Sequence, residues 1–131
     1  MLWHYQKNDV KGLPEEVAYF VYIITYNDGK KYIGMKSVWT TRRLKPLKGM
    51  RVNAKRTKLT ESKWKSYRGS SKLSKGKIIS DKEILYLCSN KRTATYLEAK
   101  TIMCSDAMFK DEYLNANCLG KFFDNALGGL I

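Results

Sequence analysis

The pattern of hydrophobic and polar positions predicts a β-hairpin near the start of the chain. Residues 17–26 form an almost unbroken run of β-branched and aromatic residues, which is typical of a strand buried on both faces. The four residues after it, Asn27-Asp28-Gly29-Lys30, have the composition of a tight turn, and residues 31–36 supply a return strand.

The length of the turn decides which side chains share a face of this hairpin. A two-residue loop at positions 28–29 would place Tyr22 and Tyr32 on opposite faces, because side chains alternate along a strand. A three-residue loop, with Gly29 left-handed in a bulge, would place Tyr22 opposite Gly34 and both phenols on one face. The composition fits either loop, and we favour the three-residue one. Gly34 would then leave a gap opposite Tyr22.

Two further elements are expected after the hairpin. Residues 83–88 form a third strand, and Ser89 or Asn90 caps a helix over 91–105. Shorter helices are expected over 37–43 and from Ser70 or Ser71 to about residue 80, whereas residues 1–16 and 47–63 read as irregular. The long helix carries an inward stripe of Ala94, Leu97, Thr101 and Cys104, with Glu98 at its edge.

The predicted order of elements, β-β-α-β-α, indicates a small α/β (α+β) fold. We expect a three-stranded, mainly antiparallel sheet flanked by helices. A chain of 131 residues has room for one domain, so residues 1–131 are taken as a single unit with a basic insertion at about 42–77.

Charge is distributed very unevenly along the chain. The net charge is +13, yet residues 42–77 contain fourteen Lys/Arg and a single acid, whereas the remaining residues balance eleven bases with eleven acids. Concentrated positive charge predicts a polyanionic partner. Aromatic residues interleaved with the bases favour nucleic acid over a membrane surface, and residues 45–63 lack the apolar stripe of a membrane-binding helix.

The rare residue types exclude several chemistries. Cys88, Cys104 and Cys118 form no C-x-x-C pair, so we expect three reduced thiols and a cytoplasmic protein. His4 is the only histidine and lies near a terminus that we expect to fray, which argues against zinc sites and histidine-based catalysis. The sequence contains no apolar run of 18 residues, and residues 1–7 lack the apolar stretch of a secretory leader, so we expect a protein that is not secreted. We expect no membrane partner.

Two short motifs flank the predicted hairpin turn. The first is Phe20-Val21-Tyr22-Ile23 and the second is Tyr32-Ile33-Gly34; a lone Glu98 lies in the long helix, and a later segment, residues 112–115, ends in Asn115. Together they resemble the GIY-YIG nuclease family, although Phe-Val replaces Gly-Ile in the first motif. Residues 64–71 and 120–123 are similar to segments of stand-alone phage-borne, Seg-like homing endonucleases. The resemblance covers about residues 17–123.

The resemblance implies a metal-dependent endonuclease that hydrolyses DNA phosphodiester bonds. Glu98 would hold one divalent cation, Mg²⁺ or Mn²⁺, which suits hard oxygen ligands. Tyr22 or Tyr32 would position or deprotonate the attacking water. The family places a catalytic arginine soon after the second motif, where Arg42 and Arg43 lie, with Arg68 as the rival if the segment between is an insertion.

The remaining site residues are expected to bind substrate. The resemblance places Asn115 among the catalytic residues, where it would bond a substrate phosphate or hold the last segment in place. The expected substrate-binding residues are Gly34, Lys36, Trp64, Lys65, Tyr67, Arg68, Ser70 and Ser71. Double-stranded DNA is the expected partner, in the host cytoplasm if the gene is phage-borne. The sequence leaves open a homodimer, re-binding or nicking, and a binding module that keeps the fold without catalysis.

Overall fold

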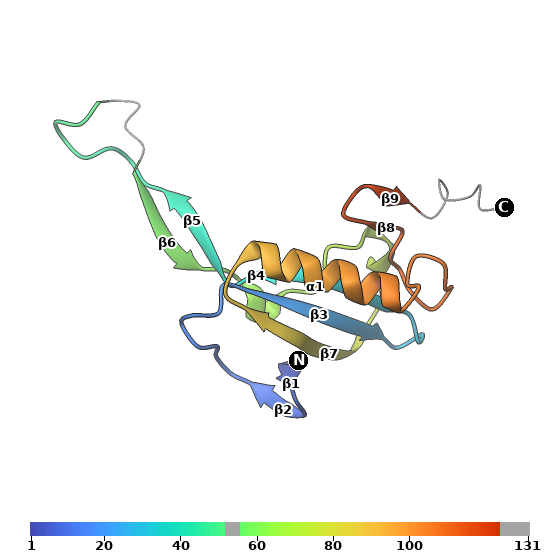
Figure 1. Ribbon diagram of the computed structural model, residues 1–131. Helices are drawn as coiled ribbons and strands as arrows, with labels where there is room; N and C mark the ends of the chain where they lie inside the picture. The colour runs from blue at the N-terminus through green and yellow to red at the C-terminus, as the bar shows by residue number, and fades with distance from the viewer. Residues whose placement is uncertain (52–55, 124–131) are drawn as a thin grey trace.

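A computed structural model describes residues 1–51 and 56–123, and a five-stranded sheet forms its centre (Figure 1). The strand order is β2-β1-β7-β3-β4. The bounds are β1 Trp3–Tyr5, β2 Asn8–Val10, β3 Tyr19–Tyr26, β4 Lys31–Ser37 and β7 Ile79–Cys88. All pairs are antiparallel except β1 with β7. Among the described residues, no helix is long and apolar enough to cross a bilayer.

The β3–β4 hairpin has the three-residue register that the sequence favoured. Tyr22 pairs with Gly34 and Ile24 with Tyr32. The amide of Tyr26 donates to the carbonyl of Lys30 at 2.8 Å, and Gly29 adopts a φ of 85°, which a glycine tolerates without cost. Both phenols therefore lie on one face of the sheet.

Helix α1 (Lys91–Cys104) covers the other face, across β3, β4 and β7 (Figure 1). Asn90 caps it by accepting a hydrogen bond from the amide of Thr93 at 2.8 Å, as expected of this residue type. Ala94 and Ile102 are its buried residues, and they pack on Val21 and Ile33. Cys104, expected on the inward stripe, is exposed, because Ile102 takes the inward position in the last turn.

The sheet has five strands instead of the expected three because residues 1–16 are not irregular. Trp3 is buried beside Phe20 and Tyr22, with ring centroids 5.2 Å from each. This burial anchors β1 along β7. His4 is accordingly held in the sheet, 2.6 Å from Asp81, and is not frayed.

The expected short helix over 37–43 is a strand. β5 (Trp39–Arg43) pairs antiparallel with β6 (Thr57–Glu61), and the two form an arm that projects from the body (Figure 1). Thr residues recur in both segments, and β-branched residues favour strands over helices. The expected loop over 47–63 thus ends in a strand; its residues 52–55 lie outside the described part.

Residues 62–78 cross the sheet face opposite α1. They contain two single turns of 3-10 helix, η1 (Trp64–Ser66) and η2 (Lys72–Ser74), and not the helix expected from Ser70 to residue 80. Ser71 does cap η2, by accepting from the amide of Leu73. Further along the chain, β8 (Asn117–Cys118) pairs with β9 (Phe122–Phe123).

Candidate active site

Three tyrosines cluster on the face of the sheet opposite α1. The ring of Tyr22 lies 6.3 Å from that of Tyr32 and 5.9 Å from that of Tyr67, centroid to centroid. Tyr22 is fully buried, and its hydroxyl has no hydrogen-bond partner among the described residues. Tyr32 is half-buried, and its hydroxyl lies 3.0 Å from Oγ of Ser70.

Gly34 makes room for Tyr22 on the neighbouring strand. A Cβ at position 34 would lie 2.5 Å from Cζ of Tyr22 and would collide with its hydroxyl. The ring of Tyr22 therefore crosses directly over β4, which is the edge strand of the sheet. The glycine of the second motif is required by this crossing, and the gap expected opposite Tyr22 is filled by the tyrosine itself.

Glu98 meets the two phenols at this edge. It lines a cleft of about 310 Å³ together with Tyr32, Ser70 and Asn115. Burial raises the pKa of both Tyr22 and Tyr32, and the negative charge of Glu98 adds to the rise. Glu98 makes no ion pair or hydrogen bond with any described residue. The cleft is also lined by Ser71, Lys72, Leu73, Leu114, Ala116 and Asn117.

Burial disfavours the charged forms of these groups. Loss of solvent raises the pKa of the Glu98 carboxyl and, with the neighbouring phenols, raises that of Tyr22 well above its usual range. Desolvation also raises the pKa of Tyr32, and the hydrogen bond from Ser70 opposes this. An unpaired, half-buried carboxyl beside neutral phenols is a site that gains from a cation.

The segment 64–71 holds one side of the cleft in place. Trp64 is fully buried, and its carbonyl accepts a hydrogen bond from Nε1 of Trp3 at 2.8 Å. The expected contact between the Trp64 ring and substrate is therefore wrong, since the ring belongs to the core. Lys65 is exposed and offers its carbonyl to Nζ of Lys82 at 3.2 Å, while Ser70 reaches Tyr32.

Lys36 and Asn115 also border the phenols. The ammonium of Lys36 lies 4.5 Å from the ring centroid of Tyr67, a cation–π contact. Asn115 is buried, accepts from the amide of Ile33 at 3.0 Å and donates to its carbonyl at 2.8 Å. Both polar atoms of the Asn115 amide are thus used to attach residues 113–117 to β4.

The three arginines considered for catalysis lie away from this cleft. Arg42 and Arg43 are exposed on β5 of the projecting arm, opposite Lys58 and Thr57 respectively. Arg68 is exposed, donates to the carbonyl of Lys77 at 3.2 Å and lines a different hollow beside Lys82. None of the six described arginines lines the cleft, where the cationic side chain is that of Lys72.

The family is decided by a match over most of the chain. The sequence model described as "Putative endonuclease segE, GIY-YIG domain" matches residues 3–118. The chain belongs to the GIY-YIG family. Membership implies a nuclease that acts on DNA. No curated protein and no solved structure matches the chain.

In this GIY-YIG domain the degenerate first motif is part of the core. Phe20 packs against Trp3 and Trp64 on one face of the sheet, and Val21 packs beneath α1 on the other. The large side chains of Phe20 and Val21 therefore fill the core on the two faces of the sheet, and Tyr22, which follows them, pairs with Gly34.

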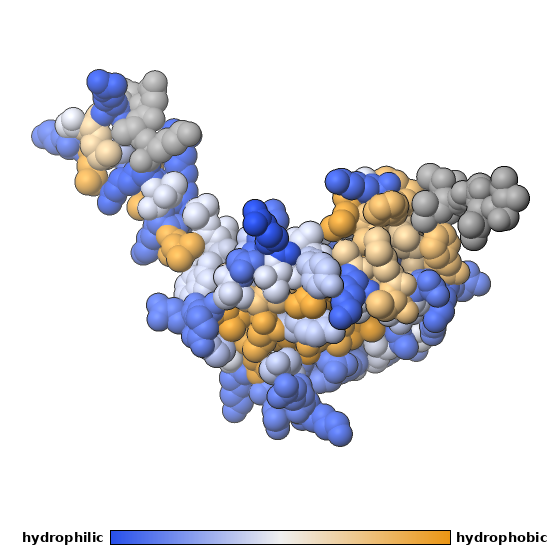
Figure 2. Space-filling model, in the orientation of Figure 1, coloured by the Kyte–Doolittle hydropathy of each residue, from blue (hydrophilic) through white to orange (hydrophobic). Residues whose placement is uncertain are grey.

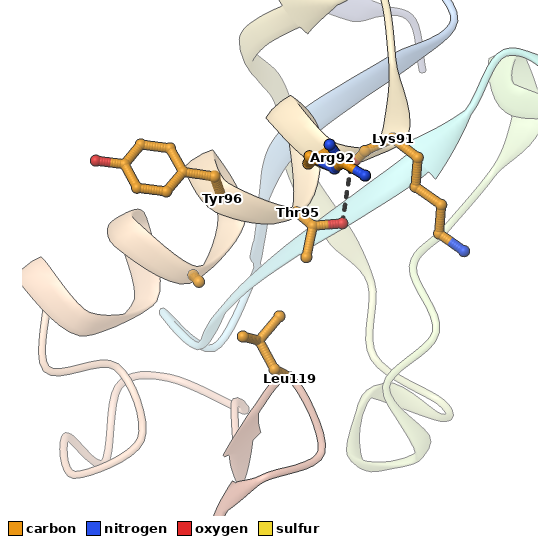
Figure 3. Close-up of a pocket in the computed structure, with 6 residues that line it drawn as sticks. Lys91, Arg92, Thr95, Tyr96 and Leu119 are labelled. Atoms are coloured by element: carbon orange, nitrogen blue, oxygen red, sulfur yellow. Dashed lines mark hydrogen bonds between the residues drawn. The ribbon is translucent and has the colours of Figure 1, made fainter.

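Two other features lie away from the cleft. A hollow of about 660 Å³ on the outer surface of α1 contains none of the expected site residues; Figure 3 shows the Thr95 hydroxyl bonded to the carbonyl of Lys91 there. Its lining is Lys91, Arg92, Thr95, Tyr96, Ala99 and Leu119. Ligand atoms of His4, Asp81 and Glu83 lie within 4.8 Å of one another across β1 and β7, two strands from β4.

Sequence reasoning missed two lysines, one at the cleft and one in the core. Lys72 lines the cleft, and Lys82 is buried with its ammonium over the ring of Trp3, 4.4 Å from the ring centroid. Lys82 occupies a polar-looking position in a strand, and its neighbours come from distant segments. The alternation of residues 79–88, which places Lys82 on the same face as the buried Ile84, was the available signal.

Proposed function

We propose that the chain is a metal-dependent DNA endonuclease of the phage-borne homing type, with its active site at the β4 edge. The supporting observation is that an unpaired, half-buried Glu98 lines one cleft together with Tyr32, and that the ring of the buried Tyr22 lies 6.3 Å from that of Tyr32. The protein has a strongly basic segment, which suits a DNA substrate.

Glu98 is the residue that would hold the cation, Mg²⁺ or Mn²⁺. Its carboxylate is a hard oxygen ligand with no competing partner among the described side chains, and such ions commonly bind one or two protein carboxylates. When bound, the cation would neutralise charge on the phosphoryl oxygens and acidify water.

The tyrosines would orient the water and the phosphate. Tyr22 stays protonated at neutral pH, because burial raises its pKa, and its unsatisfied hydroxyl would donate a hydrogen bond to a phosphate oxygen or water that reaches it. Tyr32, fixed by Ser70, would hold the second oxygen. Either phenol becomes a base only when positive charge nearby lowers its pKa.

Positive side chains would stabilise the transferring phosphoryl group. Lys36 is a candidate for this role, because its ammonium lies against the ring of Tyr67 in the tyrosine cluster. Arg42, Arg43 and Arg68 stay candidates for the catalytic arginine. Parallel alanine substitutions test them, since the catalytic arginine loses rate far more than affinity.

A second candidate function is a DNA-binding module without catalysis. The observation that favours it is that no arginine among the described residues lines the cleft, together with the degenerate first motif. A binding module would keep salt-sensitive affinity and would cut under no divalent ion.

Cleavage of supercoiled plasmid separates the two functions. Wild type should nick with Mg²⁺ or Mn²⁺ and stop with EDTA, and Glu98→Gln should lower the rate roughly 100- to 1,000-fold while retaining DNA affinity. Glu15→Gln removes the same charge from an exposed position and should leave cleavage unchanged. Equal rates in Glu98→Gln and wild type would contradict the proposed active site.

This proposal also bears on how both DNA strands are cut and on where the enzyme acts. One active site in one chain cuts one strand at a time, so cleavage of both strands requires a homodimer, re-binding or successive nicks. We place the enzyme in the cytoplasm, that of the host if the gene is phage-borne. Sedimentation of the protein on a short duplex measures its oligomeric state during binding.

A further inference from the structure

The β5–β6 arm has a firm base and no core of its own. At the base, the amide of Ser62 donates to the carbonyl of Val38 at 2.7 Å, and Trp39 packs against the core of the body. Beyond that point β5 and β6 pair only with each other within the described residues, and nearly every side chain is exposed. An isolated two-stranded ribbon is marginally stable in water, so its exposure suggests a partner.

Alternation divides the arm into two faces. One face carries Arg42 directly opposite Lys58, with Thr40 opposite Thr60 one pair nearer the body. The pairing continues by one residue, since the amide of Leu44 donates to the carbonyl of Arg56. Alternation therefore places Arg56 on the same face as Lys58. The other face carries Thr41 opposite Leu59 and Arg43 opposite Thr57, so it has no directly opposed pair of cations.

The opposition of Arg42 and Lys58 is unfavourable in the protein alone. Like charges directly across an antiparallel pair destabilise a sheet. No carboxylate relieves them: neither forms an ion pair among the described residues, and Glu61, the single acid in residues 39–61, accepts from Nε1 of Trp64 at the base. Residues 39–61 contain eight Lys/Arg, and hydrophilic side chains gather along the arm in Figure 2.

We propose that the β5–β6 arm enters the major groove of duplex DNA with the Arg42–Lys58 face against the duplex. The major groove, about 12 Å wide, admits a two-stranded ribbon, whereas the minor groove of about 6 Å must be widened to take one. Phosphates on both walls of the groove would relieve the opposed cations. This inference rests on the proposed DNA substrate and deepens it, by assigning Arg42 to docking and leaving chemistry to the cleft.

Affinity measurements with a matched control test the arm. Arg42→Ala/Lys58→Ala should weaken binding to a 30-base-pair duplex at least tenfold and reduce the steepness of its salt dependence by about 2. Lys100→Ala/Lys110→Ala removes the same charge from exposed residues elsewhere and should change affinity less than twofold. An equal loss in the control pair would overturn the proposal, since net charge alone would then explain the effect.

A charge-reversal variant distinguishes the loss of DNA contacts from unfolding of the arm. Lys58→Glu places an acid opposite Arg42, so it should keep or raise the melting temperature while weakening duplex binding. Methyl green, which occupies the major groove, should displace the protein, and netropsin, which occupies the minor groove, should not. Displacement by netropsin alone, or equal loss of single-strand and duplex affinity in Arg42→Ala/Lys58→Ala, would refute groove entry.

The outcomes also separate this inference from the proposed function. Single-turnover cleavage at saturating protein distinguishes docking from chemistry in Arg42→Ala and Lys58→Ala: a rate lost in Arg42→Ala alone would assign Arg42 to catalysis and overturn its docking role. Normal duplex affinity in those variants, together with intact cleavage, would reject the role of the arm and leave the proposed nuclease activity standing. A wild-type protein that never cuts, yet depends on the arm for duplex binding, would reject the nuclease alone.

Discussion

Lys82 is a buried cation whose replacement should stabilise the fold. It is 3% exposed, its ammonium lies above Trp3 and donates to the carbonyl of Lys65, and it has no carboxylate partner among the described residues. Burial, and secondarily the positive charge of Arg68, lowers its pKa to about 8. The folded protein therefore holds this charge at a cost that the unfolded chain does not bear.

The magnitude follows from the two pKa values. A fall from 10.5 to about 8 corresponds to roughly 3 kcal/mol against the charged form. Lys82→Met removes this cost but leaves the carbonyl of Lys65 without its donor, at about 1 kcal/mol. We expect the variant to be more stable than wild type by about 1–2 kcal/mol at pH 7.

The pH dependence gives the stricter test. Since the folded-state pKa is the lower one, the unfolded chain binds more protons between about pH 8 and 10.5, and wild-type stability gains with rising pH. By pH 9.5 this gain is about 2 kcal/mol, so the advantage of Lys82→Met should shrink or vanish. Urea unfolding followed by far-UV circular dichroism at pH 7 and 9.5 measures it, with the exposed Lys100→Met as control. A variant less stable at pH 7, with a pH-independent gap, would refute the reasoning.

Three further predictions concern the cleft. Gly34→Ala forces a methyl group into the ring of Tyr22, so it should cost about 1–3 kcal/mol of stability by urea unfolding and lower cleavage. Asn115→Ala leaves the amide and carbonyl of Ile33 unpaired and should destabilise by about 1–3 kcal/mol; unchanged stability would show that water replaces the amide. Removal of divalent cations with EDTA should abolish plasmid nicking while a filter-binding assay still detects DNA binding.

The hairpin was predictable because its signals are local. The composition of residues 27–30 predicts a turn. The three-residue loop, with Gly29 left-handed, sets the register that brings Tyr22 and Tyr32 to one face. The position of Glu98 at the cleft followed from helical periodicity together with the family resemblance, once the cap at Asn90 fixed the start of α1.

The added strands were not predictable from local pattern. β1 and β2 have three residues each, too few for periodicity to be visible, and β1 is held by a parallel pairing with β7 that lies about eighty residues away. The arm was missed for another reason. Residues 37–43 were expected to form a short helix and residues 47–63 an irregular loop, whereas the recurrence of threonine at positions 40, 41, 57 and 60 was the strand signal.

The arm and the cleft are joined by one short stretch of chain. β6 ends at Glu61, whose carboxylate accepts a hydrogen bond from Trp64 at 2.8 Å, and Trp64 is locked in the core. Six residues later Ser70 bonds Tyr32 at the cleft. Because Trp64 fixes the middle of this path, the base of the arm and the phenols hold a set spacing. DNA docked on the arm would therefore present its backbone to the cleft from a constant direction, which is how the arm would select the phosphate that the cleft cuts.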